Sequence, residues 1–324
     1  MGFCVRFVLQ NIFMNLKFNL LIITLLFCSS CKGQTSEVKP QEIEFQQNKF
    51  SKDSLLNHVK ILSSDYYEGR RTGTEGAAKT RTYITRKFKS LNIHPLIENY
   101  EQPFSFNNRG EIYNGVNVLG LIKGSMYLDK YIVISAHYDH LGIKRGNVYN
   151  GADDNASGIS ALFAFAEYFK NYPPKHSIVV AAFDAEELGL DGAKYFVQHP
   201  IIEKENIVLN INMDMIGHND KNELYVVGSN LYDYLNPAIS SVKLPSTFSL
   251  LSGHDGLDNK QNWVYSGDHA PFNENGIPFL YFGVEDHKDY HRPTDDFENI
   301  HPNFYTKSVY TIISIFQELD TMKY

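Results

Sequence analysis

Cysteine is almost absent from this chain. Only three of its 324 residues are cysteine, and they stand at positions 4, 28 and 31. The chain after Cys31 therefore forms no disulfide. It also offers no thiolate, the usual ligand of structural zinc, so a metal bound there must use histidine and carboxylate side chains. That mixture of donors suits hydrolytic zinc better than structural zinc.

The sequence also lacks concentrated positive charge and internal repeats. Its 30 Lys and Arg residues are dispersed, and the net charge is −7. The sequence shows no basic patch of the kind that nucleic-acid-binding proteins carry, so we expect no nucleic-acid partner. A chain of 324 residues is long enough to bury a real core, and it favours one large domain or two small ones.

Long hydrophobic runs are missing as well. The apolar run at residues 20–28, preceded by Lys17, is shorter than the roughly 20 residues of a membrane span. It fits the apolar region of a secretory signal peptide. Ser29-Ser30-Cys31 resembles a bacterial lipoprotein cleavage box, in which the cysteine becomes the lipidated first residue. Cys28 stands where that box prefers leucine, and an ordinary signal peptide with an incidental cysteine is the alternative.

The N-terminal pattern predicts the organisation and the location of the protein. We expect a signal peptide at residues 1–31, a polar flexible tether at 32–50 and a folded domain at 51–324. Export to the cell envelope with a lipid anchor at Cys31, on the periplasmic or outer surface, follows from this, or else secretion. The protein would contact the membrane through this lipid anchor alone. Translation could start at Met1 or at Met14.

Helical and strand-like segments alternate through the rest of the chain, which predicts an α/β fold with a mainly parallel sheet. The expected helices lie at residues 51–62, 77–91, 158–169, 191–198 and 304–319, and the expected strands at 116–122, 131–135, 177–183, 207–213, 223–227 and 279–282. In such sheets ligands bind beyond the carboxyl ends of the strands. His137, Glu186, Glu187 and Asp214 each follow an expected strand, so we expect them at one edge.

Several of these residues suggest individual roles. His137 and Asp139 flank Tyr138, and a carboxylate at Asp139 could accept the ring N–H that the metal leaves free on His137. We interpret the other nearby histidines as structural, namely His140, His269 and His287. Asp154 follows a Gly-Ala turn and precedes a helix, and its two carboxylate oxygens could bridge two metal ions. Asp153, Asp154 and Asn155 could instead be helix-capping residues.

Two pairs of adjacent residues complete the candidate site. Glu186 and Glu187 follow a buried-looking strand, and their side chains must diverge. One can ligate a metal while the other takes a proton from an activated water molecule. Tyr290 precedes His291, and its phenol could donate a hydrogen bond to the oxyanion formed during attack on a carbonyl. A packing role is the alternative for this tyrosine.

The combination resembles peptidase family M28, a family of zinc-dependent aminopeptidases, from about Leu62 to the C-terminus. The motifs occur in the family's order: His137-Tyr138-Asp139, Gly151-Ala152-Asp153-Asp154-Asn155-Ala156-Ser157-Gly158, Glu186-Glu187, Asn212-Met213-Asp214-Met215-Ile216-Gly217 and Tyr290-His291. The resemblance implies two zinc ions per chain, one held by His137, Asp154 and Asp214 and the other by Asp154, Glu187 and His291. It implies Glu186 as the general base and Tyr290 as the oxyanion donor.

The resemblance also implies a backbone and an architecture. The fold would be a single zinc-exopeptidase-like domain, a three-layer sandwich around a mixed, mainly parallel sheet, and the peptide between Asp154 and Asn155 would be cis. The segment at residues 91–131 is too short for the inserted protease-associated domain of some relatives. The family-like segments at 68–76 and 268–272 receive no catalytic role here.

Three functions stay open at this point. The first is an aminopeptidase that removes N-terminal residues from peptides with a free N-terminus, using a two-zinc-activated hydroxide. The second is a glutaminyl-peptide cyclotransferase, which uses one zinc on the same fold and carries Trp before the last His; here that residue is Tyr290, and the only tryptophan is Trp263. The third is a non-catalytic binding protein. Loops within residues 251–275 would determine which N-terminal residue of the substrate is preferred, and no sequence motif predicts that preference.

Overall fold

The computed structural model describes residues 49–324. The expected signal peptide, Cys31 and nearly all of the expected tether lie outside the described residues. The described residues belong to one compact unit that extends to the C-terminus. Within them, no helix is both long enough and apolar enough to cross a bilayer.

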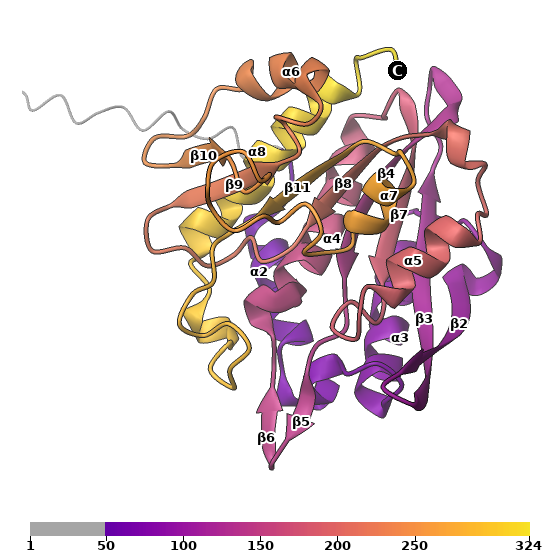
Figure 1. Ribbon diagram of the computed structural model, residues 1–324, viewed down its shortest axis with the longest axis vertical. Coiled ribbons are helices and arrows are strands. Elements are labelled where there is room, and N and C mark those ends of the chain that lie inside the picture. The colour runs from indigo at the N-terminus through magenta and orange to yellow at the C-terminus, as the bar shows by residue number, and fades with distance from the viewer. Residues whose placement is uncertain (1–48) are drawn as a thin grey trace, which may run out of the picture. The chain divides into compact units, whose positions relative to one another are not determined.

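The centre of the fold is a mixed sheet of nine strands (Figure 1). Its strands are β1 (His94–Pro95), β2 (Glu101–Asn108), β3 (Glu111–Ile122), β4 (Tyr127–His137), β7 (His176–Phe183), β8 (Ile207–Met213), β9 (Glu223–Val227), β10 (Ser249–Ser252) and β11 (Phe279–Gly283). The path through the sheet is β1-β3-β7-β4-β8-β11-β9-β10, and β2 pairs with β3. β7, β4, β8 and β11 form the parallel centre, and antiparallel pairs flank it.

Helices cover both faces of the sheet, which gives the three layers (Figure 1). Along β7 the side chains of Ile178, Val180 and Ala182 face one layer, while those of Val179 and Ala181 face the other. Such alternation, in a strand buried on both sides, accounts for its continuous apolar sequence. The first layer contains α2 (Lys52–Leu62), α3 (Glu75–Ser90), α4 (Gly158–Asn171), α6 (Asn236–Ser240) and α8 (Pro302–Leu319), and the second contains α5 (Asp191–Gln198) and α7 (Ala270–Glu274).

The expected fold class is confirmed, and the differences lie at the edges. The strand expected at 116–122 begins earlier and pairs with β2, which the sequence pattern did not predict. This edge hairpin is half exposed, so polar residues interrupt its apolar pattern. A second hairpin, β5 (Gly142–Lys144) with β6 (Asn147–Tyr149), was also not predicted. Ser51 and Thr74 cap the first two helices, because each side chain accepts a backbone N–H in the first turn of α2 and α3.

Candidate metal centre

Three neighbouring parallel strands deliver the first donor groups. His137 is the last residue of β4, Asp214 follows β8, and Glu186 and Glu187 follow β7. Because β4 lies between β7 and β8, the carboxyl ends of these strands meet at one edge. The structure therefore brings together the residues that the strand pattern placed there.

Asp154 lies at the middle of the site. Its Oδ1 is 3.3 Å from Nε2 of His137, and its Oδ2 is 3.2 Å from Nε2 of His291. The segment that holds it, η3 (Ala152–Ser157), precedes α4, and the peptide between Asp154 and Asn155 is cis, as the resemblance implies. Asp154 is therefore more than a helix cap, because its two oxygens face two different histidines.

Each histidine also faces a second carboxylate. His137 Nε2 is 3.2 Å from Asp214 Oδ1, and His291 Nε2 is 3.3 Å from Glu187 Oε2. Two donor sets result, which share Asp154. Two ligand atoms on one tetrahedral zinc ion, each at about 2.0–2.2 Å, lie roughly 3.4 Å apart, so both sets have the right spacing.

The charges of the site also fit cations. Although burial works in the opposite direction, the carboxylates of Asp214 and Glu186 raise the pKa of His137 well above its ordinary value. Burial also lowers the pKa of His291, but the carboxylates of Asp154 and Glu187 outweigh it and raise this pKa to about 10. Glu187 Oε1 is buried, and although Nδ1 of His140 lies 2.8 Å away, the two atoms are not aligned for a hydrogen bond. Divalent cations would take the place of the protons that these carboxylates otherwise hold on the imidazoles.

Glu186 and Glu187 diverge, as expected for adjacent residues. Ala185 before them has a left-handed backbone with φ of 60°, and the turn sends Glu187 towards His291 and Glu186 towards His137 and Asp214. Burial, together with the negative charges of Asp214 and Glu187, raises the pKa of Glu186 well above its usual range. A carboxyl group with a raised pKa can accept and return a proton near neutral pH.

Asp139 contacts His137 and also supports the turn that carries Glu186 and Glu187. Nδ1 of His137 donates to the backbone oxygen of Asp139 at 3.1 Å, and the Asp139 carboxylate lies farther away at 3.6 Å. That carboxylate accepts the backbone N–H groups of Glu186 at 3.0 Å and of Glu187 at 3.3 Å. Asp139 thus orients the histidine mainly through its main chain and fixes the two glutamates through its side chain.

Tyr290 stacks on His291, with ring centroids 3.9 Å apart and an interplanar angle of 26°. Burial and the carboxylates of Asp154 and Asp214 raise the pKa of its phenol, so the phenol keeps its proton and can donate. His291 itself has a left-handed backbone, with φ of 54°. Such a conformation in a non-glycine residue is uncommon and clusters at functional sites.

Sequence reasoning missed two side chains at the site. His140, which we interpreted as structural, places Nδ1 2.8 Å from Glu187 Oε1 and 3.5 Å from Asp154 Oδ2. Asp268 is buried, and neither carboxylate oxygen has a hydrogen bond to the described residues. Burial and the neighbouring carboxylates, Asp139 first, raise its pKa to about 8. Two sequence features could have indicated these residues. His140 follows His137 by three residues, and Asp268 directly precedes a histidine.

Arg70 is a structural residue of the site. Its side chain is fully buried and donates hydrogen bonds to the backbone oxygens of Tyr138 at 2.8 Å, Leu62 at 2.9 Å and Gly151 at 2.8 Å, and also to that of Asn150. These acceptors come from the segments that carry His137 and Asp154. The guanidinium therefore joins both segments to the end of α2 while adding positive charge near Asp154.

Comparison with proteins of known sequence finds relatives that include proteins named as aminopeptidases and zinc metalloproteases. Aminopeptidase YwaD of Bacillus subtilis is 33% identical over 198 residues, which cover 57% of this chain and 40% of the relative. A probable zinc metalloprotease of Pyrenophora teres is 28% identical over 196 residues, which cover 56% of this chain and 42% of the relative. The chain thus matches about two fifths of the length of these curated relatives.

Solved structures share the fold. A zinc aminopeptidase from Bacillus subtilis superposes with a TM-score of 0.67 and 18% identity, covering 83% of this chain and 95% of that chain. A glutaminyl cyclase from Porphyromonas gingivalis superposes with a TM-score of 0.70 and 18% identity, covering 84% of this chain and 99% of that chain. At this identity the likeness concerns architecture only.

The family itself is identified by sequence. A model of peptidase family M28 matches residues 117–316, more than half of the chain. The matched segment contains both donor sets, from His137 to His291, and also Glu186 and Tyr290. The chain therefore belongs to peptidase family M28.

Proposed function

We propose that this protein is an aminopeptidase that uses two zinc ions, with Glu186 as general base. The observation that carries the proposal is the position of Asp154, whose two oxygens lie 3.3 Å from His137 and 3.2 Å from His291. His137, Asp154 and Asp214 would hold one ion, and Asp154, Glu187 and His291 the other. His140 lies close enough to Glu187 to contribute to the second set. When bound, the ions would supply Lewis acidity that activates water and polarises the substrate carbonyl.

The chain's own residues would handle the protons of the reaction. Glu186 would take a proton from the attacking water as the new C–O bond forms at the first peptide carbonyl. Tyr290 would donate a hydrogen bond to the carbonyl oxygen as negative charge develops there. Glu186 would then return the proton to the peptide nitrogen as the C–N bond breaks, which releases the N-terminal residue and a shortened peptide.

Peptides with a free N-terminus suit the charge of this site. Asp154, Asp214, Glu186 and Glu187 gather around one point and favour a positively charged α-amine nearby. The dispersed basic residues and negative net charge again give no reason to expect a nucleic-acid substrate.

The structural similarity to a glutaminyl cyclase makes cyclisation of an N-terminal glutamine a second candidate function. Cyclisation of an N-terminal glutamine uses no water and would need only one zinc ion. Tyr290 stands where we expect a tryptophan in such cyclases, and the B. subtilis relative is named an aminopeptidase. Both observations favour hydrolysis.

A panel of aminoacyl-arylamide substrates tests the proposed reaction. We expect the purified protein to release the arylamine from at least one of them, to lose this activity to a chelator and to regain it with zinc. A peptide with N-terminal glutamine serves as the control for cyclisation. Conversion of that peptide to the pyroglutamyl form, with no hydrolysis of any arylamide, would replace our proposal with the cyclase function.

We further propose that the protein is exported and anchored through a lipid on Cys31, with residues 32–50 as a tether to the folded domain. Two or more acyl chains are needed for stable attachment, because one chain gives only marginal binding. Cells fed a fatty-acid analogue should label the wild type and Cys28→Ala but not Cys31→Ala. An unlabelled wild type found free in the medium would show an ordinary signal peptide and leave the catalytic proposal intact.

A further inference from the structure

The loop that carries Tyr290 and His291 also contains a histidine that the proposed reaction leaves without a role. His287 follows β11, and its ring stacks on that of His218, with 4.1 Å between the ring centroids and an interplanar angle of 11°. The His218 ring also lies 4.3 Å from that of His301. These rings pack the loop against the segment after β8 and against the start of α8.

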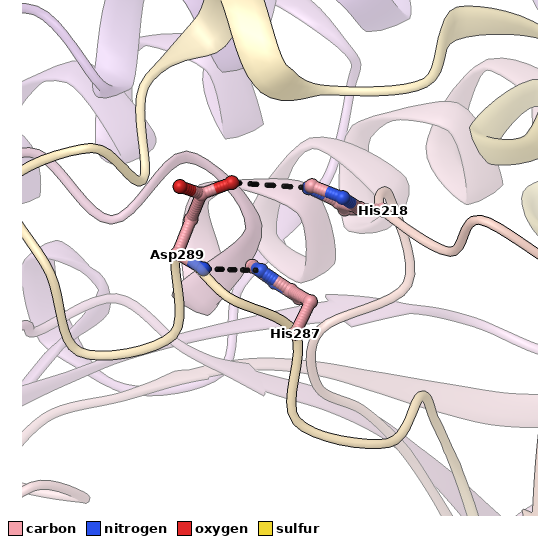
Figure 2. A group of neighbouring side chains, drawn as sticks. All are labelled: His218, His287 and Asp289. Atoms are coloured by element: carbon pink, nitrogen blue, oxygen red, sulfur yellow. Dashed lines mark hydrogen bonds and ion pairs between the residues drawn. The ribbon is translucent and has the colours of Figure 1, made fainter.

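Two hydrogen bonds fix the orientation of the His287 ring, whose side chain is only 8% exposed. Its Nε2 lies 3.1 Å from Oδ2 of Asp153, and since a carboxylate only accepts, this nitrogen donates. Its Nδ1 accepts the backbone N–H of Asp289 at 3.3 Å, two residues along the loop (Figure 2). His287 is therefore held by its own loop through one nitrogen and by Asp153 through the other.

Asp153 connects this histidine to the centre of the candidate site. It directly precedes Asp154, and its side chain is fully buried. Its other oxygen, Oδ1, accepts the backbone N–H of Gly217 at 2.6 Å, and Gly217 lies three residues after Asp214. One buried carboxylate thus joins the loop of His287 to segments that carry two of the proposed zinc ligands.

Asp295 holds the other end of the same loop. Its Oδ1 accepts the backbone N–H of Asp153 at 2.9 Å, and its Oδ2 accepts that of Asp154 at 3.0 Å. His287 lies four residues before His291, and Asp295 lies four residues after it. The loop is therefore hydrogen-bonded to Asp153 and Asp154 on both sides of His291.

His291 depends on its loop for its position. Its side chain is 39% exposed and stacks on Tyr290, which belongs to the same loop, so packing against the rest of the protein restrains it little. Its backbone is left-handed, with φ of 54°, and such conformations persist only where the surrounding structure fixes them. Yet its Nε2 lies 3.2 Å from Asp154 and 3.3 Å from Glu187, the spacing of two ligands on one zinc ion.

We propose that His287 is a positioning residue of the candidate metal centre, whose hydrogen bond to Asp153 keeps Tyr290 and His291 at their distance from Asp154. His287 touches neither the metal nor the substrate and acts through the loop. The inference rests on the proposed two-zinc function, because the loop supplies a ligand to the second donor set only. Loss of the hydrogen bond should therefore weaken zinc binding at the second donor set and leave the first unchanged.

Matched substitutions within the ring stack separate the hydrogen bond from the stacking. His287→Phe keeps an aromatic ring against His218 but removes the donor to Asp153. His218→Phe makes the same change in the adjacent ring, whose Nδ1 has no hydrogen-bonding partner among the described residues. His287→Gln makes the opposite change, because it removes the ring and keeps an N–H group that can reach Asp153.

Zinc titration against a chromogenic chelator measures the two dissociation constants of each protein. We expect one constant to rise about 10–100-fold in His287→Phe, as when other residues that orient metal ligands are removed, while the other stays as in the wild type. His218→Phe should match the wild type, and His287→Gln should recover most of the lost affinity. Equal constants in His287→Phe and His218→Phe would overturn the proposal. So would weak second-site binding in a folded His287→Gln, a comparison that holds even if His287→Phe fails to fold.

Crystals of the metal-free wild type and of metal-free His287→Phe give a second test that depends neither on the number of zinc ions nor on the reaction. We expect the distance from His291 Nε2 to Asp154 Oδ2 to stay near 3.2 Å in the wild type and to lengthen in the variant. An unchanged distance in His287→Phe would overturn the positioning role. A wild type that binds one zinc ion, or that hydrolyses no arylamide, would instead contradict the proposed function.

Discussion

Replacing Glu186 with glutamine should abolish measurable turnover while the protein keeps its fold and its metal. Glutamine has nearly the shape of glutamate but accepts no proton from water, and loss of a general base costs about 10²–10⁴ in rate. Glu186 approaches His137 and Asp214 but belongs to neither of the donor sets that share Asp154. We therefore expect kcat to fall by at least that factor, with zinc content unchanged.

Glu187→Gln is the matched control, because it makes the same change one residue along the chain. Glu187 faces His291 at 3.3 Å and His140 at 2.8 Å, so its loss should weaken metal binding at the second donor set. Zinc titration of both variants, followed by kinetics at saturating zinc, separates the two roles. Zinc loss in Glu186→Gln with full retention in Glu187→Gln would reverse our assignment of base and ligand.

Replacing Arg70 with methionine should cost about 3–5 kcal/mol of unfolding free energy, as breaking a buried charged network does. The substitution leaves the backbone oxygens of Leu62, Tyr138 and Gly151 buried without their donor. Burial lowers the pKa of Arg70 only to about 10, so the guanidinium is charged at neutral pH and its positive charge is lost too. Denaturant unfolding at pH 7 with zinc present measures the difference.

Arg71→Met provides the control for this prediction. Arg71 is only partly buried and lies over the ring of Tyr113, with its guanidinium carbon 5.9 Å from the ring centroid. Surface changes of this kind usually fall within about 0.5 kcal/mol. Equal unfolding free energies for Arg70→Met and Arg71→Met would contradict this account. They would show that the hydrogen bonds of Arg70 do not stabilise the segments around His137 and Asp154.

The strand ends could be predicted because the parallel centre of the sheet has a strong pattern. Its strands are continuous apolar runs, and the first polar residue after each run marks the edge where ligands gather. This placed His137, Glu186, Glu187 and Asp214 correctly at one edge. His291 has no such signal, since it lies in a loop after β11, and only the resemblance to the family assigned it a role.

The contacts that depend on tertiary packing could not be read from the sequence. Nothing local shows that Arg70 turns inwards, because an arginine in a Gly-rich loop is more often exposed. The same holds for His140, whose position against Glu187 depends on how β4 and β7 end side by side. The β2–β3 hairpin was missed because half of its residues face solvent and break the apolar pattern.

Anomalous X-ray diffraction at the zinc edge, on crystals of the zinc-loaded active protein, tests the two-metal proposal most directly. We expect two peaks on either side of Asp154, about 3.5–4 Å apart. One should contact His137 and Asp214, and the other Glu187 and His291. A single peak at this centre, in protein with full peptidase activity, would contradict the bridging role of Asp154 on which the proposed function depends.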